Sequence, residues 1–161
     1  MQKSYNAILE TPIGLLKITA SDKEITAVKP TKVNKYEIVS QNSNQLVKRC
    51  ARELQEYFAG QRTKFNLPIA PEGTDFQKRV WRTLQRIPYG ETRTYGEIAQ
   101  IMGKPKAARA IGMANHHNPI LILIPCHRVI GTDGSLTGYA AGVENKKYLL
   151  KLETSHSFAL Q

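Results

Sequence analysis

The sequence predicts a mixed α/β (α+β) protein: a small N-terminal antiparallel-sheet domain, followed by a mostly helical C-terminal domain with a helix-turn-helix. Three observations support this. Apolar and polar residues alternate near the N-terminus, apolar residues recur at helical spacing further along, and a Pro/Gly-rich stretch lies between the two regions. A chain of 161 residues has room for two small domains. Its 41% hydrophobic and 22% charged residues are typical of globular proteins and exclude disordered and fibrous classes.

The N-terminal domain is expected over residues 1–70. The patterns of residues 16–20 and 25–28, with a polar turn between them, predict a β-hairpin. Apolar residues then recur every four positions, at Leu46, Cys50, Leu54 and Phe58. This spacing predicts a helix, which ends at the following glycine. Residues 67–73 are the best candidate linker, so the second domain is expected over 71–161.

Two helix starts can be identified in the second domain. Thr74 with Gln77, and Thr94 with Glu97, have the spacing of capping boxes, in which two side chains satisfy each other's backbone N–H groups. The first of these helices carries an apolar stripe at Phe76, Val80, Trp81, Leu84 and Ile87. We expect Pro88 to stop it.

A helix-turn-helix is predicted next. The helix that begins at Thr94 should end at Gly103, and Pro105 should open another helix over residues 107–114. Two short helices joined by a tight, glycine-containing turn have this pattern. Small residues on the second helix would let its backbone approach a partner closely. The pattern leaves open whether that partner is a DNA groove or another helix.

Residues 120–124 are all apolar and predict a buried strand. Asp133-Gly134 predicts a turn between strands at 129–130 and 136–137. A final helix is predicted, and it carries Glu153 near its end. Its apolar residues are Val143, Tyr148, Leu149, Leu150 and Leu152. The tail over 154–161 is expected to fray.

Charge gives the first functional signal. The chain has 23 Lys and Arg against 13 Asp and Glu, a net charge of +10. The stretch from Phe76 to Arg128 contains nine basic residues and only two acidic ones. Such local positive charge attracts polyanions, most often nucleic acid. A solvated basic face without a partner is the alternative that composition leaves open.

Cys126 is the first candidate for chemistry. It follows the most apolar segment and has His127 and Arg128 beside it in sequence. Cysteine becomes a strong nucleophile as the thiolate, and a nearby imidazole or guanidinium lowers the pKa of a thiol. A buried, inert cysteine is the alternative. Cys50, on an apolar helix face, is expected to be core. Glu153 lies near the end of a helix, where a carboxylate is disfavoured, and this position indicates either a specific partner or a solvated surface glutamate.

Metal, membrane and export signals are absent from the pattern. The four histidines and two cysteines lack the spacing of zinc ligands, so no metal site is expected. His116 and His117 are interpreted as polar surface or DNA-edge residues. The longest apolar run, residues 120–124, is too short for a membrane helix, and the N-terminus lacks a signal-peptide core. We therefore expect a cytoplasmic protein with reduced cysteines.

Residues 124–129, Ile-Pro-Cys-His-Arg-Val, form a distinctive motif around this cysteine. Further segments match in order at residues 76–77, 80–81, 87–92, 95–99, 118–119 and 138–139. Together they strongly resemble the O6-alkylguanine-DNA alkyltransferases (methylated-DNA–protein-cysteine methyltransferases) from about residue 74 to Glu153. The resemblance implies that residues 1–70 are an RNase H-like supporting domain, although their own motifs are weak.

The resemblance implies a DNA repair mechanism. Cys126 would take the alkyl group from O6 of guanine in one irreversible turnover without a cofactor, and O4-methylthymine stays open as a second substrate. His127 would deprotonate Cys126 through a water, and Glu153 would hold and polarise His127. Asn118 would brace the turn before the cysteine. Tyr95 would lie by the target phosphate and help discharge the negative charge on the departing guanine.

The resemblance also implies that a monomer, with cooperative assembly left open, binds double-stranded DNA through the minor groove and flips the base out. Arg109 would fill the vacated stack. The implied DNA-contacting residues are Arg109, Tyr95, Ala107, Ala108, Lys106 and Arg128, with Lys78, Arg79, Arg82 and Lys104 as further phosphate candidates. The implied base pocket comprises Asn115, Val129, Leu136, Tyr139, Ala140 and Ala141. Ala141 replaces a glycine usual in the family, so methyl adducts should react better than bulky ones.

Three other classes compete with this hypothesis. A non-catalytic lesion binder, similar to the alkyltransferase-like proteins, would lack the acceptor cysteine that is present here. A helix-turn-helix regulator would need a dimerisation element and half-site geometry. A thiol hydrolase would need an oxyanion hole. The sequence indicates no dimerisation element, no half-site geometry and no oxyanion hole. The transferase remains the favoured hypothesis.

Overall fold

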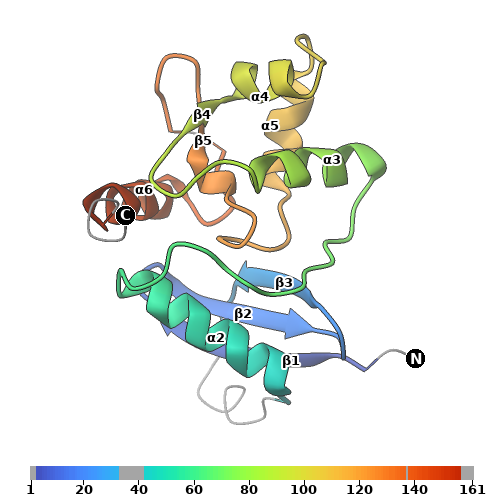
Figure 1. The fold of residues 1–161 in the computed structure, drawn as a ribbon, viewed down its shortest axis with the longest axis vertical. Helices are drawn as coiled ribbons and strands as arrows, with labels where there is room; N and C mark the ends of the chain where they lie inside the picture. The colour runs from blue at the N-terminus through green and yellow to red at the C-terminus, as the bar shows by residue number, and fades with distance from the viewer. Residues whose placement is uncertain (1–2, 33–41, 137, 157–161) are drawn as a thin grey trace. The chain divides into compact units, whose positions relative to one another are not determined.

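The computed structural model describes residues 3–32, 42–136 and 138–156. Contacts within the chain divide it into two compact units, Met1–Pro71 and Glu72–Gln161. Figure 1 shows one unit built on a sheet and the other built mostly of helices. Each unit buries its own apolar residues, including Ile18 and Leu54 in the first and Trp81 and Ile111 in the second.

The first unit contains a three-stranded antiparallel sheet in the order β1-β2-β3. The strands are β1 (Tyr5–Thr11), β2 (Gly14–Ala20) and β3 (Ile25–Pro30). The predicted hairpin between β2 and β3 is confirmed, with Ile18 paired to Val28. The sequence analysis missed β1, which joins β2 through a tight turn.

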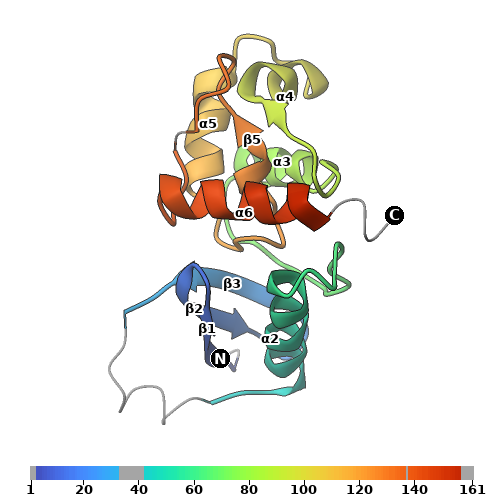
Figure 2. The same ribbon diagram turned by 90° about the vertical axis from the view of Figure 1, so that its left-hand side faces the viewer.

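Helix α2 (Gln45–Phe58) packs on this sheet against β1 and β2, as Figure 2 shows. Asn44 caps it by accepting a hydrogen bond from the Val47 backbone N–H at 2.9 Å. Its buried face is formed by Val47, Cys50, Glu53, Leu54 and Tyr57. Cys50 is a core residue, as predicted, whereas Leu46 and Phe58 are only half-buried because the buried face is turned by one residue.

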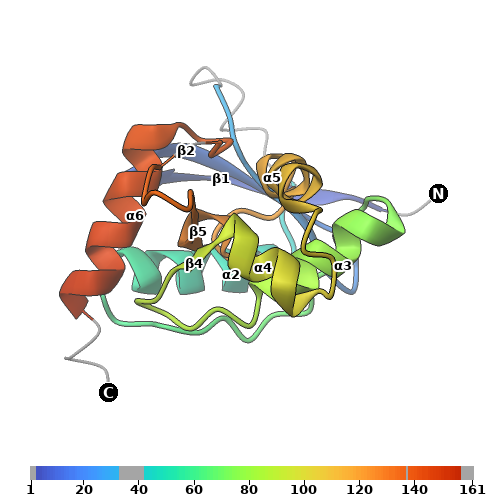
Figure 3. The ribbon, with the colours of Figure 1, turned by 90° about the horizontal axis from the view of Figure 1, so that it is seen from above.

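The second unit begins with α3 (Asp75–Leu84), α4 (Tyr95–Ile101) and α5 (Ala108–His116), seen from above in Figure 3. Both predicted capping boxes are present. Trp81 of α3 donates its indole N–H to the Ala114 carbonyl of α5 at 2.9 Å, which ties these two helices together inside the core. Helices α4 and α5 pack against each other in the arrangement predicted for a helix-turn-helix.

Two predicted helix boundaries were wrong. α3 ends at Leu84, before the proline expected to stop it, because the backbone N–H groups of Arg86 and Ile87 donate to carbonyls three residues earlier, those of Thr83 and Leu84. Pro105 does not open α5. It lies in a separate turn closed by a hydrogen bond from the Ala107 N–H to the Lys104 carbonyl at 2.9 Å, and α5 starts after it.

The predicted buried strand over residues 120–124 is also wrong. These residues form a tight loop in which the Ile124 N–H donates to the Ile120 carbonyl at 3.1 Å. Ile122 has φ +73°, which is strained for a β-branched residue. The segment is buried, as its composition requires, but its backbone bonds close locally instead of joining a sheet.

The chain next forms a short 3₁₀ turn, η1 (Cys126–Arg128), and β5 (Val129–Ile130). β5 pairs in parallel with β4 (Arg93–Thr94). The predicted hairpin from residues 129–130 to residues 136–137 is wrong at residue 136, which lies in no strand. Thr137 lies outside the described residues. The predicted turn at Asp133-Gly134 is present, closed by a hydrogen bond from the Gly131 N–H to the Ser135 carbonyl at 2.9 Å.

The last helix, α6 (Val143–His156), continues through residues expected to fray. Its final turn is stabilised because the side chains of Thr154, Ser155 and His156 bond to carbonyls four residues earlier. Residues 157–161 lie outside the described part of the chain. No helix among the described residues is long and apolar enough to cross a membrane.

Candidate active site

Cys126 is fully buried at the start of η1, directly after the 120–124 loop. Asn118 fixes this loop from both ends. Its Nδ2 donates to the Ile124 carbonyl at 2.8 Å, and its Oδ1 accepts from the Ile120 N–H at 2.9 Å. The Cys126 N–H donates to the same Ile124 carbonyl at 2.8 Å. The position of the sulfur is therefore set by a braced, strained loop.

His127 is also fully buried and pairs with Glu153 of α6, across 2.6 Å between Nε2 and Oε2. A carboxylate only accepts hydrogen bonds, so Nε2 carries the proton and Nδ1 carries a lone pair. Nδ1 is buried and has no hydrogen-bond partner within the described residues. Burial lowers the pKa of His127, with Glu153 opposing this effect, so the imidazole is neutral near pH 7.

Glu153 also accepts from Arg128, at 2.8 Å from Nε and 3.0 Å from a terminal nitrogen, and from the Gly90 N–H at 3.1 Å. Burial raises the pKa of Glu153, but His127 and Arg128 together outweigh burial and hold it well below its usual range. His127 and Arg128 are therefore the specific partners of this carboxylate, which lies near the end of a helix.

The predicted contact of Arg128 with DNA stays a prediction, and in this structure the Arg128 side chain faces the interior of the unit. Its side chain is buried, and its third nitrogen donates to the Ile87 carbonyl at 2.7 Å. All of its nitrogens are thus used inside the unit. The sequence placed Arg128 next to Cys126 but could not show which side of the chain it faces.

The thiol of Cys126 is held in its neutral form. Burial raises its pKa to about 11, although Asn118 and the positive charge of Lys146 lower it. Lys146 is itself fully buried, and burial lowers its pKa to about 8 while Cys126 raises it. The sequence analysis missed Lys146. Its place seven residues before Glu153 on one helix was the available signal, because residues seven apart share a helix face.

The structure brings part of the predicted pocket together. Asn115 of α5 donates from Nδ2 to the Cys126 carbonyl at 3.3 Å. The ring of Tyr139 lies edge-on to His127 at 6.5 Å between centroids, and its hydroxyl is buried with no partner within the described residues. Val129 is buried, whereas Leu136 and Ala141 are half-buried and Ala140 is exposed.

The predicted DNA-contacting residues surround the start of α5. Arg109 and Lys106 are exposed, and Ala107 and Ala108 are half-buried. Tyr95 is half-buried at the start of α4. A Cβ placed on Gly112 of α5 would lie 3.8 Å from the Tyr95 ring, which is an ordinary van der Waals distance. The outer face of α5 also exposes the apolar Met113, which is 58% accessible.

A second basic feature lies between α3 and α4. Arg79, Arg82 and Arg86 border a surface hollow of about 260 Å³, with Thr83, Ile101 and Met102 completing its lining. Arg79, Arg82 and Arg86 are exposed, and none is paired with a carboxylate in the described part of the chain. The hollow therefore offers concentrated positive charge.

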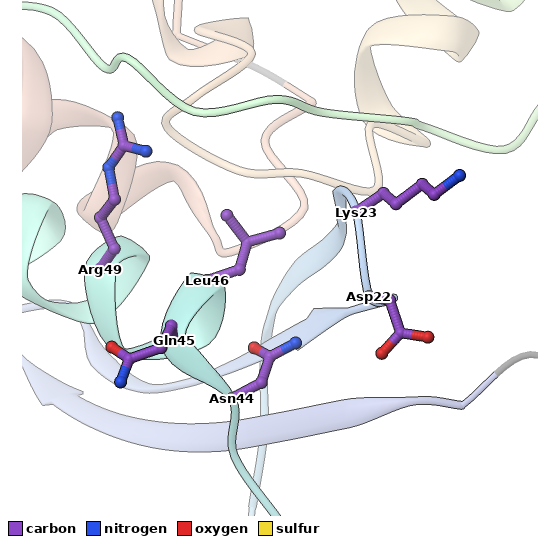
Figure 4. Close-up of a pocket in the computed structure, with 6 residues that line it drawn as sticks. All are labelled: Asp22, Lys23, Asn44, Gln45, Leu46 and Arg49. Carbon is purple, nitrogen blue, oxygen red and sulfur yellow. The ribbon is translucent and has the colours of Figure 1, made fainter.

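The first unit has a hollow of about 480 Å³, shown in Figure 4, lined by Asp22, Lys23, Asn44, Gln45, Leu46 and Arg49. Two of its polar side chains have structural partners: Asn44 caps α2, and Arg49 bonds Glu53 and the Asn66 carbonyl. No cluster of three His, Cys, Asp or Glu side chains suited to a metal ion occurs within the described residues.

Two family models cover most of the chain. Residues 75–155 match the DNA binding domain of 6-O-methylguanine DNA methyltransferase, and residues 4–71 match its ribonuclease-like domain. The chain belongs to the methylated-DNA–protein-cysteine methyltransferase family. This confirms the resemblance carried by the motif around Cys126.

Relatives and solved structures agree with this assignment. Methylated-DNA–protein-cysteine methyltransferases of Methanosarcina acetivorans and Bacillus subtilis are 49% and 44% identical, covering 94% and 93% of this chain and 99% and 95% of their own. The Mycobacterium tuberculosis O6-methylguanine methyltransferase has a TM-score of 0.85 at 42% identity, over 96% of this chain and 94% of its own. A crystal structure of that organism's OGT in complex with DNA has a TM-score of 0.84 at 43% identity, over 94% and 93%.

These findings confirm the predicted mixed α/β fold and the predicted activity. The methyltransferase repairs DNA by transferring an alkyl group from the DNA to a protein cysteine, and DNA is its partner. The non-catalytic alternative is less well supported, because the chain carries Cys126 and matches named methyltransferases over nearly its whole length.

Proposed function

We propose that Cys126 accepts the alkyl group from O6-alkylguanine in duplex DNA in a single turnover. The sulfur attacks the alkyl carbon, a carbon–sulfur bond forms, and the bond from that carbon to O6 breaks with its electrons going to the base. The thioether that results is stable, so each molecule reacts once. The observation that carries this proposal is the buried Cys126 beside the His127–Glu153 pair, whose Nδ1 has no partner among the described residues.

His127 supplies the base for this step. With its pKa raised to about 11, the Cys126 thiol needs a proton acceptor at neutral pH. The Nδ1 lone pair takes the proton through one bridging water, and the imidazolium that forms is stabilised by Glu153 at 2.6 Å. Lys146 adds positive charge near the developing thiolate. Asn118 acts by positioning, because it holds both ends of the loop before the cysteine.

The departing guanine carries negative charge until it gains a proton. Tyr95, at the start of α4, is proposed to lie by the target phosphate and to donate a hydrogen bond that stabilises this charge until the base takes up a proton, which balances the proton that His127 removed from the thiol. The Lys146 ammonium lies 6.0 Å from the centre of the Tyr95 ring, which links Tyr95 to the charged residues around Cys126.

The helix-turn-helix is proposed to enter the minor groove with α5 foremost. Reaction inside the duplex is prevented by stacking, so the damaged base is flipped out at a cost of about a few kcal/mol. Arg109 is exposed near the start of α5 and would fill the vacated space, while Ala107 and Ala108 allow close approach and Lys106 neutralises a phosphate.

The hollow between α3 and α4 is proposed as an additional contact for the DNA backbone. Arg79 and Arg82 were phosphate candidates from the sequence, and Arg86 joins them in the hollow. Unpaired guanidinium groups are well suited to phosphate oxygens. Lys78 and Lys104 extend the same basic surface.

The flipped base is proposed to lie against Asn115, Val129, Leu136, Tyr139, Ala140 and Ala141. Residues 1–70 act as a supporting domain, and residues 71–161 bind DNA and accept the alkyl group. The protein would act inside the cell as a monomer without a cofactor, because the chemistry uses only a thiol, a base and the substrate's own leaving group. Reaction with O4-methylthymine would use the same site.

Intact-protein mass spectrometry tests the proposal. After mixing with duplex DNA that carries one O6-methylguanine, the protein should gain the mass of one methylene, mapped to Cys126 and saturating at one per chain. Cys126→Ser should gain nothing while it still binds the duplex. A gain mapped to another residue, or a gain in Cys126→Ser, would contradict the assignment of the acceptor.

A further inference from the structure

Asn115 has one side-chain atom without a structural role. The residue lies near the end of α5 and is almost completely buried. Its Nδ2 donates to the Cys126 carbonyl at 3.3 Å, and this fixes the orientation of the amide, because a carbonyl only accepts. Its Oδ1 is therefore the atom left over. Oδ1 is buried and has no hydrogen-bond partner anywhere in residues 3–32, 42–136 and 138–156.

A buried acceptor without a donor costs stability, so such an atom in a binding site indicates a ligand that brings the donor. Two other polar atoms around Cys126 are also without partners. His127 Nδ1 is already assigned to the thiol proton, and the Tyr139 hydroxyl can either donate or accept. The Oδ1 of Asn115 differs from both, since it can only accept and no step of the reaction uses it.

The chemistry of the substrate limits what this acceptor can bind. Alkylation at O6 removes the proton that guanine normally carries on N1. The remaining N–H donors of the base are those of its exocyclic 2-amino group. This argument depends on the proposed substrate. We propose that Asn115 Oδ1 accepts a hydrogen bond from the 2-amino group of the flipped O6-alkylguanine, which makes Asn115 a specificity-determining residue.

The placement of Asn115 gives this contact a consequence for the reaction. The same amide that reads the 2-amino group is bonded to the backbone carbonyl of the attacking Cys126. Recognition of one edge of the base is thus coupled to the position of the sulfur through a single side chain. A base without the amino group leaves Oδ1 unpaired in the closed complex and is disfavoured for that reason.

The test compares two substrates in one duplex sequence: O6-methylguanine and O6-methylhypoxanthine, which differ only in the 2-amino group. Single-turnover transfer rates are measured for the full chain by mass spectrometry. The wild-type protein should react at least about tenfold more slowly with O6-methylhypoxanthine than with O6-methylguanine. Asn115→Leu keeps a similar volume but removes the acceptor, so its preference for O6-methylguanine should be reduced about tenfold relative to the wild-type preference.

Because Asn115→Leu also loses the bond to Cys126, its rates on both substrates should fall together, and only the ratio reports on Oδ1. Asn115→Asp keeps an acceptor oxygen and should keep the preference at a lower overall rate. Gln85→Leu is the matched control, since Gln85 also donates from its side-chain amide to a backbone carbonyl, that of Trp81 at 3.3 Å, outside the proposed base pocket. Its ratio should equal that of the wild-type protein.

Three results would overturn the inference: a wild-type protein indifferent to the amino group, an Asn115→Leu variant with the wild-type ratio, or an Asn115→Asp variant that loses the preference. The last outcome applies even if Asn115→Leu does not fold. Failure of the proposed function is separate, since in that case the wild-type protein would not be methylated by O6-methylguanine at all.

Discussion

The proton arrangement at His127 is set by the residues that bury it. Glu153 accepts from Nε2 and from Arg128, so the carboxylate is charged and the imidazole presents Nδ1 as a base. Both groups have a lower pKa in the folded protein than their ordinary values of 6.5 and 4.5. The folded state therefore binds fewer protons than the unfolded state on acidification, and protonation favours unfolding.

The free energy of unfolding should consequently fall as the pH is lowered. The contribution of His127 is complete above about pH 6.5 and is lost below it, and that of Glu153 is lost below about pH 4.5. His127→Gln should make the dependence between pH 7 and pH 5 shallower, as measured by denaturant unfolding at each pH. The exposed Gln100 of α4 provides the control, since Gln100→Ala removes no titratable group and should leave the wild-type dependence unchanged. Equal slopes for all three proteins would show that His127 is not the group involved.

Ala141 carries a methyl group at a position where the family resemblance leads us to expect glycine. It is half-buried, and its carbonyl is held by Asn145, so its Cβ can narrow the pocket without being displaced easily. Ala141→Gly should increase the rate with O6-benzylguanine several-fold and change the rate with O6-methylguanine little. Rates from mass spectrometry decide this. If the two adducts already react equally in the wild-type protein, and Ala141→Gly changes neither, residue 141 does not limit the pocket.

The resemblance of the sequence to a known family predicted that Cys126, His127, Glu153 and Asn118 belong to one site, and the structure brings these residues together. The sequence could not show that Arg128 turns inward, or that Lys146 is buried near the cysteine. Both facts depend on how α6 packs against η1, which is a contact between segments far apart in the chain. Local patterns carry no direct information about such contacts.

Among the elements, capping boxes were the most reliable signals. Thr74 and Thr94 mark the true starts of α3 and α4, because the bonds that define a capping box lie within four residues. The 120–124 loop was misjudged for the opposite reason. Five apolar residues fit a buried strand or a buried loop equally well, and the outcome was decided by the Asn118 side chain, which replaces a neighbouring strand as hydrogen-bond partner.

Helix α5 gives a prediction of its own. Because Arg109 is exposed near its start and far from the His127–Glu153 chemistry in sequence, Arg109→Ala should slow repair of duplex DNA by at least tenfold. Reaction with free O6-benzylguanine, which needs no base flipping, should change little. Arg52 on α2 is exposed and basic, so Arg52→Ala is the matched control and should affect neither reaction. Equal losses on duplex and free base in Arg109→Ala would exclude the stack-filling role.

At the scale of the whole molecule, the net charge of +10 and the unpaired arginines between α3 and α4 predict strongly salt-dependent binding. The logarithm of the affinity should fall by about 0.9 per log unit of salt for each phosphate neutralised. Arg82→Gln should reduce this slope by about one such unit in fluorescence-anisotropy titrations, and Arg62→Gln in the other unit should not. A slope independent of salt in the wild-type protein would contradict backbone contacts altogether.

The complete burial of Cys126 has one more consequence. A methyl group left on its sulfur has to fit where the braced loop and the His127 ring leave no exposed surface, and overpacking of this kind costs about 1–3 kcal/mol. The spent protein should therefore melt at least about 2 °C below the unreacted one, in thermal scans of the two forms side by side. A protein molecule that has already reacted would be less stable than an unreacted one. Cellular proteases could therefore distinguish reacted copies from unreacted ones without any dedicated label.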